Sequence, residues 1–366
     1  MIFNDILKFA IGSRHPEQHD DDGDGRQLPG PRAVREVRKA LQGANRSQID
    51  KALEQLARGR NDPEWHRKWE VMVRILDKEI CQGAAIINAY LAIVESGFRS
   101  AELQVREQSF DCWKVLTFIF AKYSQINSPK RVKLICIPLK SSKSKTEMIA
   151  RRKFEIWWFM VNQLGEELEK FADAVFEPFI YFCFGPSFKT PLCYYFDDSY
   201  QEYGTPGKFF DSIKQLSAIA LIHMLGPADK VTESLLQQSN GCAASFNLLI
   251  PLKPIPARLV SEKLKLLFNS CLECTVLLAQ MKDKPYLELN RNLWRNLLAR
   301  VECEESVTKP EMLAWMQENL SALVKLKQSI GRSLSLKYRT NIPIHFPVTL
   351  PLFVAGAGID QHDMGL

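Results

Sequence analysis

Residues 144–165 have the sequence Ser-Lys-Thr-Glu-Met-Ile-Ala-Arg-Arg-Lys-Phe-Glu-Ile-Trp-Trp-Phe-Met-Val-Asn-Gln-Leu-Gly. Ser144 and Glu147 have the capping-box spacing that starts a helix, and Gly165 is a typical helix stop. The segment between them predicts a helix about 30 Å long. Its apolar residues recur at helical spacing, so they form one stripe that neighbouring helices must cover. This predicted structural core consists of Phe154, Trp157, Trp158, Val161 and Leu164.

Helical patterning continues over most of the chain from residue 32 onward. Strand signals, such as alternating runs that flank Asn-Gly or Asp-Gly turns, are nearly absent. A long series of helices with short connections predicts an all-α, HEAT/armadillo-like helical-repeat superhelix. A compact multi-helix bundle is the structural alternative. The predicted helical segments after residue 60 are 63–76, 81–94, 102–122, 129–139, 144–165, 168–184, 208–225, 228–239, 256–281, 286–303 and 309–329.

Composition predicts a folded protein with three parts. The hydrophobic fraction is 46% and the charged fraction is 25%, which is typical of folded soluble proteins. We expect a short helix and acidic loop leader at 1–31, a helical-repeat array at 32–330 and a poorly ordered tail at 331–366. An exposed insertion is expected at about 185–207, where prolines, glycines and tyrosines interrupt the helical pattern. Nine cysteines without a secretory signal favour reduced thiols in the cytosol or nucleus.

Two short patterns resemble metal sites but lack required residues. The acidic loop at 20–31 begins like an EF-hand, but Pro31 stands where calcium coordination requires a glutamate. Cys271 and Cys274 form a CxxC pair inside an apolar helix, with no second pair to complete a zinc site. No phosphate-binding loop or nucleophile elbow is present. The sequence therefore predicts no enzyme, with no catalytic residue, metal, cofactor or small-molecule substrate, and no membrane partner.

Positive charge is concentrated between residues 130 and 153. This segment of 24 residues contains nine Lys or Arg residues and one acid, so it carries +8, whereas the whole chain carries +6. A localised basic cluster can follow a nucleic-acid backbone through phosphate contacts that are salt-dependent and independent of base sequence. A surface for an acidic protein partner and a solvated loop without a ligand remain open as alternatives. The candidate DNA-binding residues are Lys130, Arg131, Lys133, Lys140, Lys143, Lys145, Arg151 and Arg152.

Several short motifs occur in order between residues 65 and 227. They are 94–100, 110–114, 129–139, 146–147, 153–158, 164–165, 203–207 and 223–227. Together they resemble the telomere-associated Rif1-type proteins, the Rap-interacting factor family. The resemblance corresponds to the interior of the family's N-terminal HEAT-repeat region and is weaker outside residues 65–227.

The resemblance implies a helical superhelix without catalysis, and nuclear localisation at chromosomes and telomeres. It implies roles in telomere maintenance, replication-timing control and double-strand-break repair, with DNA and chromatin proteins as partners. The family also recruits protein phosphatase one through short docking motifs. Residues 131–134 depart from the Arg-Val-x-Phe docking motif because Leu134 replaces the aromatic residue, and residues 333–337 match the second motif only loosely. The alternative function is a HEAT-type scaffold that uses a basic face for acidic proteins without binding DNA.

Overall fold

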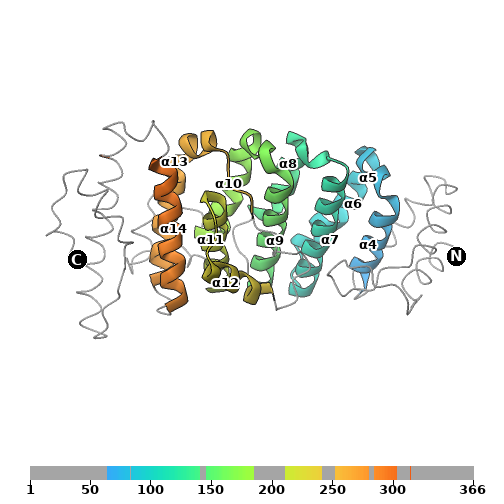
Figure 1. Cartoon of the computed structure of the whole chain (residues 1–366). Coiled ribbons are helices and arrows are strands. Elements are labelled where there is room, and N and C mark those ends of the chain that lie inside the picture. The colour runs from blue at the N-terminus through green and yellow to red at the C-terminus, as the bar shows by residue number, and fades with distance from the viewer. Residues whose placement is uncertain are drawn as a thin grey trace, which may run out of the picture. The chain divides into compact units, whose positions relative to one another are not determined.

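The computed structural model describes residues 64–82, 84–140, 146–184, 211–240, 252–279 and 284–302, together with residue 314. All regular elements within these ranges are helices (Figure 1), as the all-α prediction requires. None of the helices described there is both long enough and apolar enough to cross a membrane. The predicted leader, the insertion at about 185–207, the helix at 309–329 and the tail at 331–366 lie outside the described residues. The chain divides into two compact units.

The first unit contains the helix that the opening sequence predicts. This helix, α9, spans Glu147–Leu164, and the predicted cap at Ser144 lies outside the described residues. Gly165 follows it with a φ of 51°, a left-handed conformation that glycine adopts without a steric penalty. The other elements are α4 (Trp65–Leu76), α5 (Lys78–Gln82), α6 (Ala84–Phe98), α7 (Leu103–Lys122), the 3₁₀ turn η2 (Gln125–Asn127) and α8 (Pro129–Leu139).

Helices α4, α7 and α9 lie parallel to one another (Figure 1). Residues that pair between neighbouring helices of this set are separated by a nearly constant number of residues in the sequence. Three side-chain pairs join α7 to α9, and each pair is separated by 41 residues: Asp111–Arg152, Lys114–Glu155 and Phe118–Phe159. Trp65 of α4 pairs with Gln108 of α7, and Asp77, the residue after α4, pairs with Lys122 of α7, at separations of 43 and 45 residues. These offsets match the period of HEAT and armadillo repeats, roughly 40–47 residues. The repeat is therefore present in three dimensions, although the sequence has no repeated motif.

The core of the first unit is rich in tryptophan. Trp157 and Trp158 of α9 are buried, as are Phe154, Val161 and Leu164. A buried indole needs a partner for its N–H group. That of Trp113 donates to the carbonyl of Ile135 at 3.2 Å, and that of Trp69 to the carbonyl of Tyr90 at 3.2 Å. These bonds join α7 to α8 and α4 to α6.

Helices α6 and α7 approach each other closely at Gly97. A Cβ atom at this position would lie 2.0 Å from the Oγ atom of Ser109 and 3.2 Å from its Cβ, so a larger residue would force Ser109 or the helices to shift. Gly97 is one of the residues of the 94–100 motif. The motif therefore includes a position at which helix packing requires a glycine.

The second unit repeats the parallel arrangement with two pairs of helices. Ion pairs join Glu169 and Asp173 of α10 to Arg258 and Lys263 of α13. Hydrogen bonds join the end of α11 to α14. Pro178 lies inside α10, which continues without a break through it. The elements are the 3₁₀ turn η3 (Gly165–Glu167), α10 (Leu168–Phe184), α11 (Asp211–Leu225), α12 (Lys230–Asn240), α13 (Ala257–Ala279) and α14 (Lys284–Glu302).

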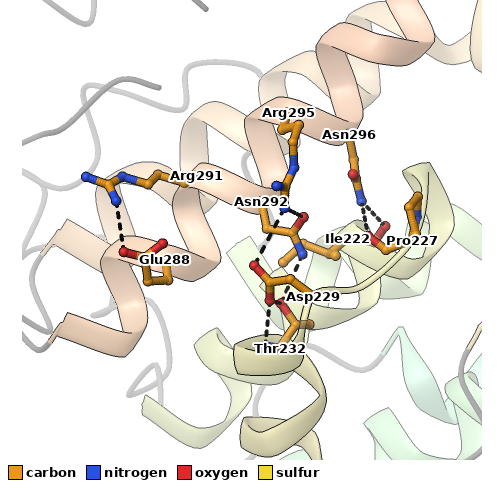
Figure 2. A network of polar contacts seen from close by, with 9 residues as sticks. All are labelled: Ile222, Pro227, Asp229, Thr232, Glu288, Arg291, Asn292, Arg295 and Asn296. Atoms are coloured by element: carbon orange, nitrogen blue, oxygen red, sulfur yellow. Dashed lines mark hydrogen bonds and ion pairs between the residues drawn. The ribbon is translucent and has the colours of Figure 1, made fainter. Parts of the chain in front are cut away.

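Side chains of α14 satisfy the backbone at the end of α11 (Figure 2). The last carbonyl groups of a helix have no partner within that helix. Asn296 donates to the carbonyls of Ile222 and Pro227 at 3.1 and 3.0 Å. One turn later, Arg300 donates to the carbonyl of Leu225 at 2.8 Å. One turn earlier, Asn292 donates to the hydroxyl of Thr232 at 3.1 Å. This polar cluster fixes the turn between α11 and α12, so its role is structural.

Candidate nucleic-acid interface

Among the described cations of the basic segment, those with exposed side chains lie on helix α8. Val132, Ile135, Cys136 and Leu139 form its buried face. Lys130 and Lys133 lie one turn apart on the exposed side, and α8 contains no acidic residue. Lys130 and Arg131 fall in the first turn, where the helix dipole makes positive charge unfavourable. The charges of Lys130 and Arg131 therefore do not stabilise α8 through its dipole.

The remaining described cations at α8 extend this surface. Arg131 is half-buried, and its guanidinium carbon lies 4.8 Å from the ring centre of Phe120. Lys140 is half-buried at the end of α8, where a cation interacts favourably with the helix dipole. We refer to Lys130, Arg131, Lys133 and Lys140 as the α8 basic face. The predicted site residues Lys143 and Lys145 lie outside the described residues.

Arg151 and Arg152 lie in a different environment from the α8 basic face. Both side chains are only 13% exposed and form ion pairs within the first unit. Arg151 Nε lies 3.2 Å from Glu155 Oε1. Arg152 Nε lies 3.0 Å from Asp111 Oδ1, close enough for an ion pair but without hydrogen-bond alignment. Both arginines pair with carboxylates inside the first unit, so among the described cations of the basic segment the exposed ones, Lys130 and Lys133, lie on α8.

Lys114 completes this buried ion network. Its Nζ atom donates to Glu155 Oε2 at 2.9 Å, and the two side chains are 5% and 1% exposed. Burial lowers the pKa of Lys114, and the neighbouring Glu155 carboxylate opposes that effect. Sequence reasoning missed this network. Its one local signal is Glu155 inside an apolar stripe, four residues after Arg151. The partner on α7 is 41 residues away and has no local signature.

Lys153 belongs to the same charge run, yet it lies in the core. Its side chain is buried, and its ammonium nitrogen lies 5.6 Å from the ring centre of Phe110. Burial disfavours the charged form, which lowers the pKa of Lys153 from 10.5 to about 8. The folded protein at neutral pH therefore holds a poorly solvated charge at this position.

We expect Lys153→Met to stabilise the first unit at pH 7, by about 1–3 kcal/mol after loss of the contact with Phe110. In the unfolded chain this lysine titrates near 10.5, whereas in the folded chain it titrates at about 8. The buried ammonium therefore lowers the free energy of unfolding by its full amount below pH 8. This destabilisation decreases between pH 8 and 10.5 and is absent above pH 10.5. Urea unfolding at pH 7 and pH 10 measures this difference. Lys133→Met, at an exposed position, is the control, and a gain for Lys153→Met that does not change with pH would contradict the interpretation.

Other groups with chemical potential are packed in the second unit. Cys271 and Cys274 are buried in α13, and burial raises the pKa of the Cys271 thiol, which keeps it protonated. His223 is also buried, and desolvation lowers its pKa. Across the described ranges, no group of three or more His, Cys, Asp or Glu residues could hold a metal ion.

The fold and this site define an all-α helical-repeat protein with a basic helix in its first unit. Residues 32–177 match the family model described as "Rap1-interacting factor 1 N terminal". Residues 32–177 are therefore assigned to the N-terminal region of the Rif1 family.

Curated relatives agree with this assignment. The chain is 40% identical to Telomere-associated protein RIF1 of Drosophila melanogaster over 121 residues, which cover 33% of this chain and 8% of the relative. It is 25% identical to Telomere-associated protein RIF1 of Homo sapiens over 308 residues, which cover 77% of this chain and 12% of the relative. The chain thus spans a small part of the length of the relatives it matches. No solved structure matches it.

Proposed function

We propose that this chain is a non-enzymatic, telomere- and chromosome-associated protein that binds DNA through the α8 basic face. The name of its relatives, telomere-associated protein, supports the chromosomal role. Nuclear localisation is proposed on the same ground. The proposal extends to telomere maintenance, replication-timing control and double-strand-break repair, with other chromatin proteins as further partners.

The observation that carries this proposal is the exposure of Lys130 and Lys133 on a helix without acidic residues. Lysine contacts phosphate as a flexible point charge, and such contacts position a protein on DNA without reading its sequence. Each neutralised phosphate releases counterions, so binding should weaken steeply as salt rises. Arg151 and Arg152 are engaged in ion pairs, so the described residues that we propose for DNA contact are the four of the α8 basic face.

Fluorescence anisotropy with duplex DNA at several salt concentrations tests the proposal. We expect Lys130→Gln with Lys133→Gln to weaken binding by about tenfold at low salt and to reduce the salt slope by about 2. The matched control is Lys78→Gln with Arg99→Gln, which changes the net charge equally at two exposed positions of the same unit. Equal affinities and slopes for the two double variants would contradict the role of α8. Protein partners retained after nuclease treatment, without DNA binding, would favour the scaffold alternative.

Phosphatase recruitment through residues 131–134 is not part of this proposal. These residues form part of α8, and Val132 is fully buried against the rest of the first unit. A docking peptide must present its apolar anchor to the partner, so α8 would have to unfold first. The second motif, at 333–337, lies outside the described residues.

A further inference from the structure

The residue that precedes α8 is a serine with a free hydroxyl. Ser128 is half-buried and is followed by Pro129, Lys130 and Arg131. Its φ and ψ are −88° and 129°, an extended conformation, and its side chain makes no capping hydrogen bond. Its carbonyl, by contrast, accepts the first bonds of α8, from the backbone N–H groups of Arg131 and Val132 at 2.9 and 3.0 Å. Ser128 therefore caps α8 through its backbone carbonyl, whereas its hydroxyl makes no bond to the helix.

The sequence around this hydroxyl has the form that proline-directed protein kinases recognise, in which a serine is followed by proline and then by basic residues. Such kinases bind their substrate extended, and a residue before proline already favours this conformation. The first turn of α8 has to open for Lys130 and Arg131 to enter an extended site. Their positive charges oppose the helix dipole there, which makes this turn easier to open. In the described part of the chain, no other serine or threonine precedes a proline.

We propose that Ser128 is a phosphorylation site for a proline-directed kinase, and that the phosphate switches off the α8 basic face. In the reaction, the Ser128 oxygen takes the γ-phosphoryl group of ATP, the hydroxyl proton passes to the base of the kinase, and ADP leaves. The switch rests on the proposed DNA-binding function, whereas the modification itself does not.

The phosphate would be held by the same groups that are proposed to hold DNA. It adds about −2 of charge at a helix N-cap, where the dipole and the first N–H groups favour an anion. Lys130 and Arg131 follow in the same turn and can pair with it. Residues 129–140 carry +4, so roughly half of this charge would be cancelled. A phosphodiester backbone would then lose its contacts at the start of α8.

Treatment of the full chain with a purified proline-directed kinase and ATP, followed by site-localised mass spectrometry, tests the modification. We expect phosphate on Ser128 in the folded protein and none at this position in Ser128→Ala. Labelling of an isolated peptide of residues 122–140, together with no labelling of the folded chain, would overturn the proposal, because the hydroxyl would then be inaccessible in the fold.

Anisotropy with duplex DNA then tests the switch. We expect the phosphorylated protein to bind about tenfold more weakly than the untreated protein, with a salt slope reduced by about 2. Kinase-treated Ser128→Ala should bind like the untreated protein, which controls for phosphate at Thr190 or Thr205, the other hydroxyl-bearing residues that directly precede a proline. Unchanged binding after phosphorylation of Ser128 would overturn the switch. If the untreated protein does not bind DNA, the proposed function and the switch fail together, while mass spectrometry still decides the site.

Discussion

Replacement of Trp157 by alanine is expected to lower the free energy of unfolding of the first unit by about 3–5 kcal/mol. The indole is fully buried in α9, and its ring centre lies 5.6 Å from that of Phe154. Its removal leaves a cavity that neighbouring helices cannot fill without breaking their own contacts. Equilibrium unfolding in urea, followed by the helical circular dichroism signal, measures the change.

Trp158→Ala should have a similar effect, because Trp158 is equally buried and packs against the same phenylalanine at 6.0 Å between ring centres. The control is Ile137→Ala, at a residue 63% exposed on α8, for which a change within about 0.5 kcal/mol is expected. Unchanged unfolding midpoints for both tryptophan variants would show that α9 is not part of a packed core.

The helices of this protein are predictable from local sequence, but their register is not. Ser128-Pro129 predicts the start of α8, and the structure confirms that α8 begins at Pro129 and ends at Leu139. The spacing of Phe154, Trp157 and Leu164 predicts which face of α9 is buried. In contrast, the 41-residue offset between α7 and α9 is defined by pairs of different chemistry. One is the ion pair Lys114–Glu155, and the other, one turn later, is the aromatic pair Phe118–Phe159. Chemically different pairs leave no repeated motif, so only the fold shows the repeat.

The candidate site shows a related limit, because a charge run in sequence need not form one surface. Lys133 and Arg151 belong to the same basic segment and differ in environment. The helical phase of α8 turns Lys133 toward solvent, whereas that of α9 turns Arg151 toward Glu155. A count of charges gives +8 for the segment without showing how much of it is compensated. The carboxylates that pair with the arginines are Asp111 on α7 and Glu155 within the apolar stripe of α9. The sequence around them gives no sign of a charged site.

Glu155→Gln is expected to cost about 3–5 kcal/mol of unfolding free energy, which makes Glu155 as important to stability as a core tryptophan. The carboxylate is 1% exposed and pairs with Lys114, Arg151 and Arg152. A neutral amide of the same size keeps the packing but leaves the Lys114 ammonium buried without its carboxylate. The control is Glu64→Gln, in an exposed pair with Arg67, for which a change below about 1 kcal/mol is expected.

A double variant separates charge from packing at the same place. Lys114→Met with Glu155→Leu removes both buried charges, so it should be less destabilising than Glu155→Gln although it changes more atoms. The same urea unfolding experiment compares the two. If Glu155→Gln costs no more than Glu64→Gln, the network is solvated and its arginines are only loosely held. Arg151 and Arg152 would then be free to exchange a carboxylate for a DNA phosphate, and the interface would extend from α8 to α9.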